Sequence, residues 1–112
     1  MSPLHPTRRL ILEEATRSSD GAGGAETSWA AKGTLWAEVT PLSPRSAQAA
    51  AGPTQLLPVR ILLRGAPMGA PSRPKAGQRL REGARLYLID AVTEADPLGR
   101  TLLCLAHEEV VT

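Results

Sequence analysis

Leu35-Trp36-Ala37-Glu38-Val39-Thr40-Pro41-Leu42 is the stretch of sequence that decides the fold. If it forms a β-strand, Leu35, Ala37 and Val39 share one face and the residues between them share the other, because successive side chains of a strand point to opposite faces. Pro41 has no N–H to donate to a neighbouring strand, so the strand ends there. One strand cannot bury an apolar face alone, and the rest of the chain must supply its partners.

Several other segments have strand character, with large apolar residues two positions apart on one face. Leu10 and Leu12 flank Ile11, and further along Val59 and Ile61 flank Arg60. Frequent short strands without a long helical pattern predict an all-β fold, a small β-barrel or sandwich of about six strands. The expected strands cover residues 7–14, 35–42, 55–64, 76–82, 85–92 and 101–106.

Two long connections interrupt these strands. Residues 17–24 contain an Asp20-Gly21 turn signal that is lengthened by further glycines, and residues 25–33 carry one large side chain, Trp29. In residues 43–53, Ser43 is a candidate N-cap followed by Pro44, which predicts one or two helical turns. We therefore expect a single domain, residues 1–112, with loop arms near 17–33 and 43–55.

The composition limits the class of protein. The chain has 112 residues, a formal net charge of +2, no Phe and one cysteine. The core must therefore be aliphatic, an intrachain disulfide is excluded, and the whole-chain charge does not by itself predict a nucleic-acid-binding protein. The first residues lack the apolar run of a signal peptide, and no apolar run is long enough to predict a membrane span.

No residue pattern predicts catalysis or a bound metal. His5, Cys104 and His107 would form at most a three-ligand site, and only if the two termini met. Cys104-x-x-His107 lacks the paired spacing of zinc sites, and Cys104 reads better as a small buried apolar residue. The glycines after Asp20 lack the strand, helix and Lys-Ser/Thr pair of a phosphate loop. We expect no catalytic residue, no metal and no cofactor.

Basic residues cluster in the second half of the chain. Between residues 60 and 85 there are seven basic side chains and one acidic side chain, Glu82. Such residues can contact DNA phosphates, pair with acids across a subunit interface or lie on a solvated face. The scarcity of aromatic residues nearby argues against a base-stacking surface. The candidates for a DNA-facing or subunit-interface surface are Arg45, Arg60, Arg64, Arg73, Lys75, Arg79, Arg81 and Arg85.

We interpret both tryptophans as structural residues. Trp36 is expected to pack in the core or at a subunit interface, and Trp29 is expected to anchor the long arm to the barrel. The candidates for contacts with a partner are Asp20, Gly21, Trp29, Trp36, Leu42 and Ser43.

A series of short motifs resembles a known family. The chain has D-G-x-G-G at residues 20–24, then T-x-W, W-A-x-V-x-P-L-S from residue 36, V-R-I-L-L-R from residue 59, G-A-R-L-Y-L-I-D-A-V from residue 83 and D-x-x-G-R-x-L-L-C from residue 96. Their order and spacing resemble the small head–tail joining proteins, also called head-closure or stopper proteins, of tailed bacteriophages and gene transfer agents. The chain departs from the family's frequent S-G-R-E at residues 43–46 and is richer in proline at residues 65–75. The matching positions are Asp20, Gly21, Gly23, Gly24, Thr27, Trp29, Trp36, Ala37, Val39, Pro41, Leu42, Ser43, Arg60, Ile61, Arg64, Gly83, Arg85, Tyr87, Ile89, Val92, Leu102, Leu103, Cys104 and Glu109.

The resemblance implies a small β-barrel that assembles into a homo-oligomeric ring, with six subunits favoured and twelve possible. The ring would lie at the head–tail interface of a virion or phage-like particle, below the portal and its adaptor protein and above the tail or its terminator protein, after synthesis in the bacterial cytoplasm. It would retain the packaged double-stranded DNA without sequence preference and give the tail a docking surface. The resemblance implies no catalysis, no cofactor and no membrane.

Each arm has an expected role, and two other functions remain open. Residues 17–33 are expected to reach a neighbouring subunit or an adjoining ring, and residues 43–55 to face the lumen or the adaptor above. A stand-alone, Arg-rich nucleic-acid-binding module would bind DNA tightly and salt-sensitively as a monomer. A tail-completion (terminator) protein, one ring lower, would have a nearly identical sequence pattern.

Overall fold

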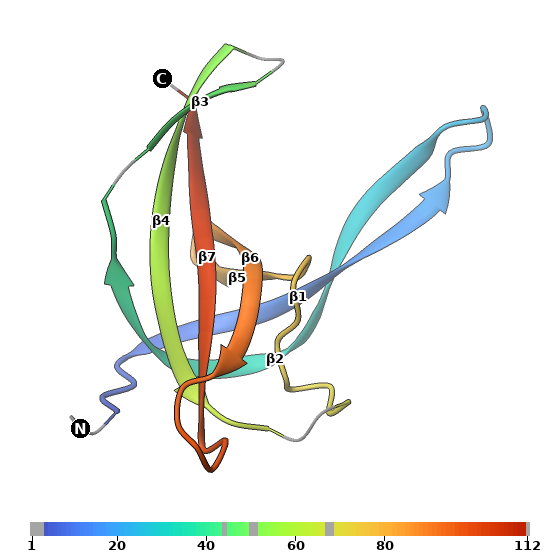
Figure 1. Ribbon diagram of the computed structural model, residues 1–112. Coiled ribbons are helices and arrows are strands. Elements are labelled where there is room, and N and C mark those ends of the chain that lie inside the picture. Colours follow the sequence, from blue (N-terminus) through green and yellow to red (C-terminus); the bar gives the residue numbers. More distant parts are fainter. Residues whose placement is uncertain (1–3, 44, 50–51, 67–68, 112) are drawn as a thin grey trace.

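The protein folds entirely as strands and the turns between them. The computed structural model describes residues 4–43, 45–49, 52–66 and 69–111, and no helix occurs in these ranges, so none of them could cross a membrane as a helix. The all-β prediction is confirmed, with seven strands where about six were expected. The strands are β1 (Arg8–Ser19), β2 (Ala25–Pro41), β3 (Arg45–Ala49), β4 (Gly52–Arg64), β5 (Arg79–Glu82), β6 (Arg85–Glu94) and β7 (Thr101–Val111) (Figure 1).

Six of these strands close into a barrel. Their order is β2-β1-β5-β6-β7-β4, and β4 pairs with β2 to complete the circle. All the pairings are antiparallel. In a circle of six, strands three places apart face each other, so β1 lies opposite β7 and β2 lies opposite β6. Figure 1 shows β4 and β7 in front of β1 and β2.

The core follows the alternation predicted from the sequence. In the central strand β2, Ala37 is fully buried, Leu35 and Val39 pack against the core, and Trp36 on the other face is 55% exposed. Cys104 is fully buried, as expected, and burial raises its pKa to about 12. The buried apolar residues are Leu10, Leu12, Ala37, Val59, Ile61, Leu63, Leu80, Tyr87, Ile89, Leu102, Cys104 and Ala106.

The helical turn predicted at residues 43–53 is wrong. Arg45 pairs with Leu56 and Ala49 pairs with Gly52, so this segment is a β-hairpin of β3 and β4, with residues 44, 50 and 51 outside the described ranges. The register of β3 on β4 differs by one residue from that of β2 on β4. The strand β3 therefore continues the path of β2 along the same edge of β4. Hydrogen-bond partners on β4 override the helix preference of an Ala-rich segment, which is too short to be a stable helix alone.

The region around residues 17–33 is also more regular than the sequence predicted. The ladder of β1 and β2 runs from Arg8 and Ala37 to Ser19 and Ala25, with one register shift after Leu12. Since β1 pairs with β5 over residues 11–13, the hairpin leaves the barrel beyond that point. We call residues 14–31 the first arm, and the β3–β4 hairpin (residues 45–49 and 52–56) the second arm.

The arms make the molecule elongated. Its extents are 51 × 31 × 23 Å, and its radius of gyration is 15.3 Å. A compact domain of this length has a radius of gyration of about 13 Å. The first arm, at the upper right of Figure 1, and the second arm, at the top, account for the difference.

Candidate functional site: assembly surfaces

A buried carboxylate fixes the root of the first arm. The side chain of Glu13 is 8% exposed, and it accepts hydrogen bonds from Arg79 Nε at 2.7 Å and from Arg81 Nε at 3.0 Å. Burial alone would raise the pKa of Glu13, but the two arginines outweigh it and the pKa is lowered. Both carboxylate oxygens are satisfied, so β1 and β5 are held together where the arm leaves the barrel.

Further contacts join the first arm to the barrel. The guanidinium carbon of Arg79 lies 4.1 Å from the centroid of the Trp29 ring, which is the geometry of a cation–π contact. Lys32 Nζ lies 3.3 Å from a carboxylate oxygen of Glu14, and this pair lowers the pKa of Glu14. Trp29 therefore anchors the arm to the barrel, as expected from the sequence.

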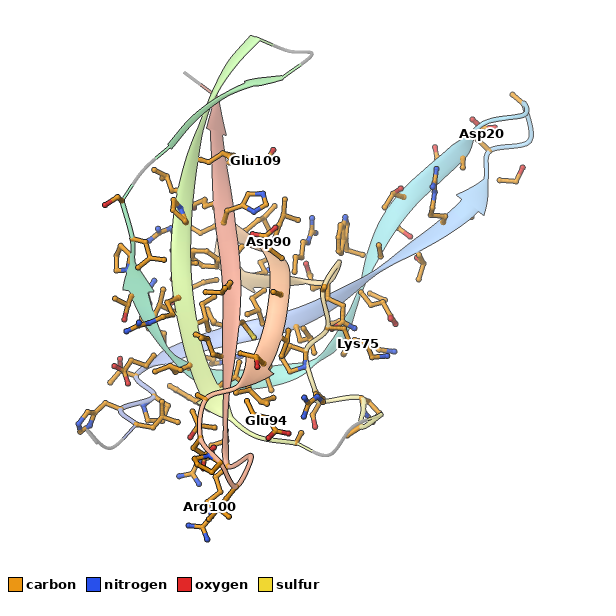
Figure 2. The ribbon with its side chains drawn as sticks, viewed as in Figure 1. Asp20, Lys75, Asp90, Glu94, Arg100 and Glu109 are labelled. Carbon is orange, nitrogen blue, oxygen red and sulfur yellow. The ribbon has the colours of Figure 1, made fainter. Side chains whose placement is uncertain are left out.

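The tip of the first arm has a defined turn. Asp20 Oδ1 accepts hydrogen bonds from the backbone N–H groups of Ala22 at 2.8 Å and Gly24 at 3.0 Å. Gly21 and Gly23 have φ angles of 81° and 86°, which favour glycine over residues with a side chain. Asp20 thus lies at the outer end of the arm, far from the barrel (Figure 2).

One end of the barrel, which we call the mouth, carries a charged network. Arg8 donates hydrogen bonds to both carboxylate oxygens of Glu82, one of them at 2.6 Å, and to Tyr87 Oη at 3.3 Å. Arg85 binds Glu108 through two hydrogen bonds of 3.1 and 3.0 Å. The pKa of Glu82 is lowered, first by the hydrogen bonds from Arg8. These side chains border a pocket of about 180 Å³ lined by Arg8, Val39, Pro41, Leu42, Leu57, Pro58, Val59, Arg85, Tyr87 and Glu108.

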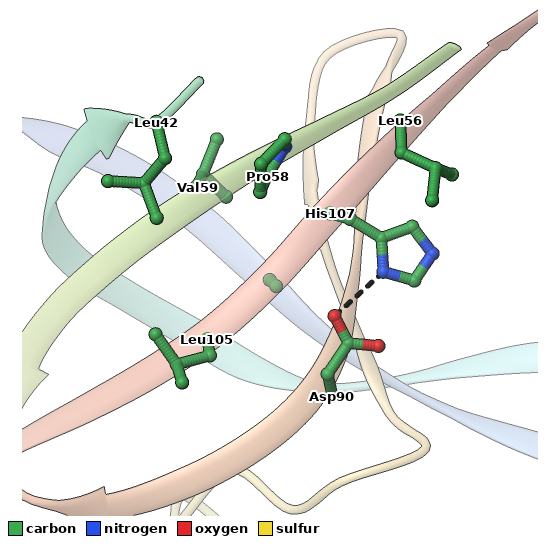
Figure 3. A pocket seen from close by; sticks show the side chains of 8 residues that line it. Leu42, Leu56, Pro58, Val59, Asp90, Leu105 and His107 are labelled. Carbon is green, nitrogen blue, oxygen red and sulfur yellow. Dashed lines mark hydrogen bonds and ion pairs between the residues drawn. The ribbon is translucent and has the colours of Figure 1, made fainter. Parts of the chain in front are cut away.

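A second hollow, which we call the outer groove, lies on the wall formed by β4, β7 and β6. Its volume is about 430 Å³ (Figure 3). Leu105 is 41% exposed and Leu42 is 42% exposed, so the groove is mostly apolar and open to solvent. Its lining residues are Leu42, Leu56, Pro58, Val59, Asp90, Leu105, Ala106 and His107.

Acidic side chains and a histidine form the polar side of the outer groove. Asp90 follows the buried Ile89 on β6 and points outward, and its carboxylate lies 2.8 Å from His107 Nδ1 (Figure 3). Glu109 lies 3.3 Å from the other ring nitrogen, Nε2. Burial lowers the pKa of His107, but the two carboxylates more than offset this and the pKa is raised. Asp90 and Glu109 are 54% and 53% exposed, so both carboxylates remain accessible.

The basic residues predicted from the sequence do not form one surface. Three of them bind carboxylates of their own chain, Arg79 and Arg81 at Glu13 and Arg85 at the mouth. Arg73 donates a hydrogen bond of 2.9 Å to the carbonyl oxygen of Ala66. Arg45 lies on β3, in the second arm. Within the described part of the chain, the exposed candidates without an ion-pair partner are Arg60, Arg64 and Lys75.

The partner-contact candidates are also spread over the molecule. Trp36 lies on the outer face of β2, and Leu42 and Ser43 lie where β2 gives way to β3. Leu42 lines both the mouth and the outer groove.

The outer groove was not predicted from the sequence, although one signal for it was present. The alternation that buries Cys104 and Ala106 places the apolar Leu105 between them on the outside.

Comparisons with known proteins identify the family. The profile of a family described as phage head completion protein matches residues 1–109. A chain of a solved structure described as "Virion of native gene transfer agent (GTA) particle" is 46% identical, with a TM-score of 0.86 and 100% of each chain covered. Protein SF1141 from Shigella flexneri 2a is 21% identical, with a TM-score of 0.65 and 96% of each chain covered, and shares the fold. No curated protein matches. The chain therefore belongs to the phage head completion protein family, and it is a structural protein of a phage or phage-like particle.

Proposed function

We propose that the chain, acting as one connector domain, forms a homo-oligomeric ring of six subunits at the head–tail interface. The ring lies below the portal and its adaptor and above the tail or its terminator protein. It retains packaged DNA and gives the tail a docking surface, without catalysis or a cofactor. The observation that carries this proposal is the match over the full length of both chains, at 46% identity, to a chain from a gene transfer agent virion.

The two arms support assembly into a ring. A two-stranded hairpin is marginally stable in water by itself, and beyond its root the first arm is exposed on both faces. Exposed strand edges readily pair with other chains. We therefore assign the first arm to contacts with a neighbouring subunit or an adjoining ring. The second arm, which continues β4 past the mouth, is assigned to the lumen or to the adaptor above.

The exposed basic residues support weak contact with DNA in the channel. Arg60, Arg64 and Lys75 are exposed and can interact with phosphates without reading sequence. Six copies in a ring would multiply these charges around a polyanion. A stand-alone DNA-binding module is a weaker proposal, because Arg79, Arg81 and Arg85 are already paired with carboxylates of the same chain.

Cryo-electron microscopy of the particle that contains this chain tests the proposal. Six-fold averaging below the portal should show the barrel as a ring around the DNA axis, with one arm toward the lumen. A ring adjoining the tail tube, without contact to the adaptor, would instead indicate a tail-completion protein. Absence of the chain from the particle, together with tight DNA binding by the purified monomer, would overturn the proposal.

A further inference from the structure

Two unpartnered surfaces lie on opposite walls of the barrel. One is the outer groove, on β4, β7 and β6. The other is centred on Trp36, whose side chain is 55% exposed on the outer face of β2 beside its cross-strand neighbour, the exposed Arg9 of β1. Because β1 faces β7 and β2 faces β6 in the barrel, the two surfaces point in opposite directions. We call Arg9 and Trp36 the tryptophan face.

The two surfaces also lie toward the same end of the barrel. Arg8, next to Arg9, lines the mouth from one side. Leu42 and Pro58, which belong to the outer groove, line the mouth from the other side. When two copies stand side by side in the same orientation, the tryptophan face of one copy and the outer groove of the other therefore lie at the same height along the barrel and can meet.

Their chemistry is complementary. The groove is apolar with a volume of about 430 Å³, and exposed aromatic rings are favoured anchors of interfaces because they bury a large area at a small entropic cost. Asp90 and Glu109 border the groove, and their summed charge stays negative even when His107 between them is protonated. The groove thus presents an acidic border beside an apolar surface.

The tryptophan face presents groups that match this surface. Arg9 supplies a base and Trp36 the aromatic ring. We propose that Trp36 of one copy inserts into the outer groove of the next copy, with Arg9 against the acidic border. A contact between different surfaces of identical chains repeats from copy to copy, and it closes into a ring when the rotation between copies divides the full circle. The inference rests on the ring proposed above and names the surfaces that build it.

Cross-linking in assembled particles tests this contact directly. The double variant Arg9→Cys/Asp90→Cys keeps Trp36, and the native Cys104 is buried and does not compete for a thiol reagent. Treatment of particles with a short bismaleimide should link neighbouring subunits covalently. The products should form a ladder of species that ranges from linked pairs up to the complete ring. Particles built from either single variant should stay unlinked, because each carries one half of the contact.

Substitutions measure the contribution of each part. Trp36→Ala should weaken assembly roughly 30-fold, as expected for a central aromatic anchor. Leu98→Ala is the matched control, because Leu98 is an even more exposed apolar residue, at 71%, in the turn between β6 and β7. Arg9→Glu and Asp90→Arg should each weaken assembly, and their combination should restore it. Circular dichroism of each variant checks that the barrel is folded.

The outcomes separate this inference from the proposed function. A ring in the particle without a ladder, together with normal assembly of Trp36→Ala, would overturn the interface and leave the ring function intact. Particles that lack the wild-type chain would overturn the function itself. A ladder from the double variant, with rescue by the charge exchange, would support both.

Discussion

Glu13 is the residue on which the direction of the first arm depends. Its carboxylate is buried and accepts hydrogen bonds from Arg79 and Arg81, so the variant Glu13→Gln leaves two guanidinium groups without their counter-ion. We expect a loss of about 2 kcal/mol in the free energy of unfolding. Urea denaturation measures it, with Glu26→Gln on the exposed part of the arm as the control. A change below about 0.5 kcal/mol would show that the cluster is not a stabilising one.

Acid should destabilise the barrel through its paired carboxylates. The pKa values of Glu13 and Glu82 are both lowered from 4.5, so their contribution is complete above that pH and is lost as the pH falls through the folded-state values. The melting temperature of the wild type should therefore fall steeply below about pH 4.5. The double variant Glu13→Gln/Glu82→Gln should start lower and show a shallower fall over the same range. Parallel curves would argue against these two groups as the cause.

His107 should act in the opposite direction. Its pKa is raised from 6.5 by Asp90 and Glu109, so its contribution is complete below that value and disappears as the pH rises through the folded-state pKa. We expect a small decrease in melting temperature above about pH 6.5 that is absent from His107→Gln. NMR titration of the ring protons provides an independent check, since an unshifted midpoint would contradict the predicted direction.

At the scale of elements, the first arm should be dispensable for folding. None of the twelve core residues comes from residues 14–31. Replacing residues 16–28 by an Asn-Gly turn, which suits a two-residue hairpin, should leave a cooperative barrel whose free energy of unfolding changes by about 1 kcal/mol or less. Leu80→Ala, in the core, is the comparison and should cost about 2–5 kcal/mol. Loss of cooperative unfolding after the arm deletion would contradict this separation.

Period-2 alternation predicted most of the barrel but not the arms. Leu10 and Leu12, or Val59 and Ile61, show which face is buried because an apolar core selects them locally. In the second arm, Ala-rich residues 45–49 become a strand because β4 offers hydrogen bonds to them. Strand preference of this kind depends on neighbours rather than on the segment itself.

The candidate site was less predictable than the fold because its contacts join distant parts of the chain. Glu13 and Arg79 are 66 residues apart, and Arg8 and Glu82 are 74 apart. The local sequence does not distinguish an arginine that forms an ion pair within its own chain from one that faces DNA. The pairing of Asp90 on β6 with His107 on β7 likewise joins residues that are 17 positions apart in the chain.

At the scale of the whole molecule, DNA binding should be weak and should depend on few charges. Each phosphate contact contributes about 0.9 to the slope of the logarithm of affinity against the logarithm of salt concentration. Arg60→Gln/Arg64→Gln should lower that slope by roughly 2, equally for duplexes of different sequence. Fluorescence anisotropy over a salt series measures it, with Lys32→Gln, whose amine is paired with Glu14, as the control. An unchanged slope would place the DNA contacts elsewhere.

The long ladder between β4 and β7 has a mechanical consequence. It joins eleven residue pairs, from Thr54 with Val111 to Arg64 with Thr101, and the second arm is the outer part of the same β4. Hydrogen bonds of an antiparallel ladder stand perpendicular to the strands. A load applied to the arm along the strand direction therefore strains these bonds in shear, all at once, instead of opening them one after another. Pressure on the arm would be shared along the full height of the barrel wall.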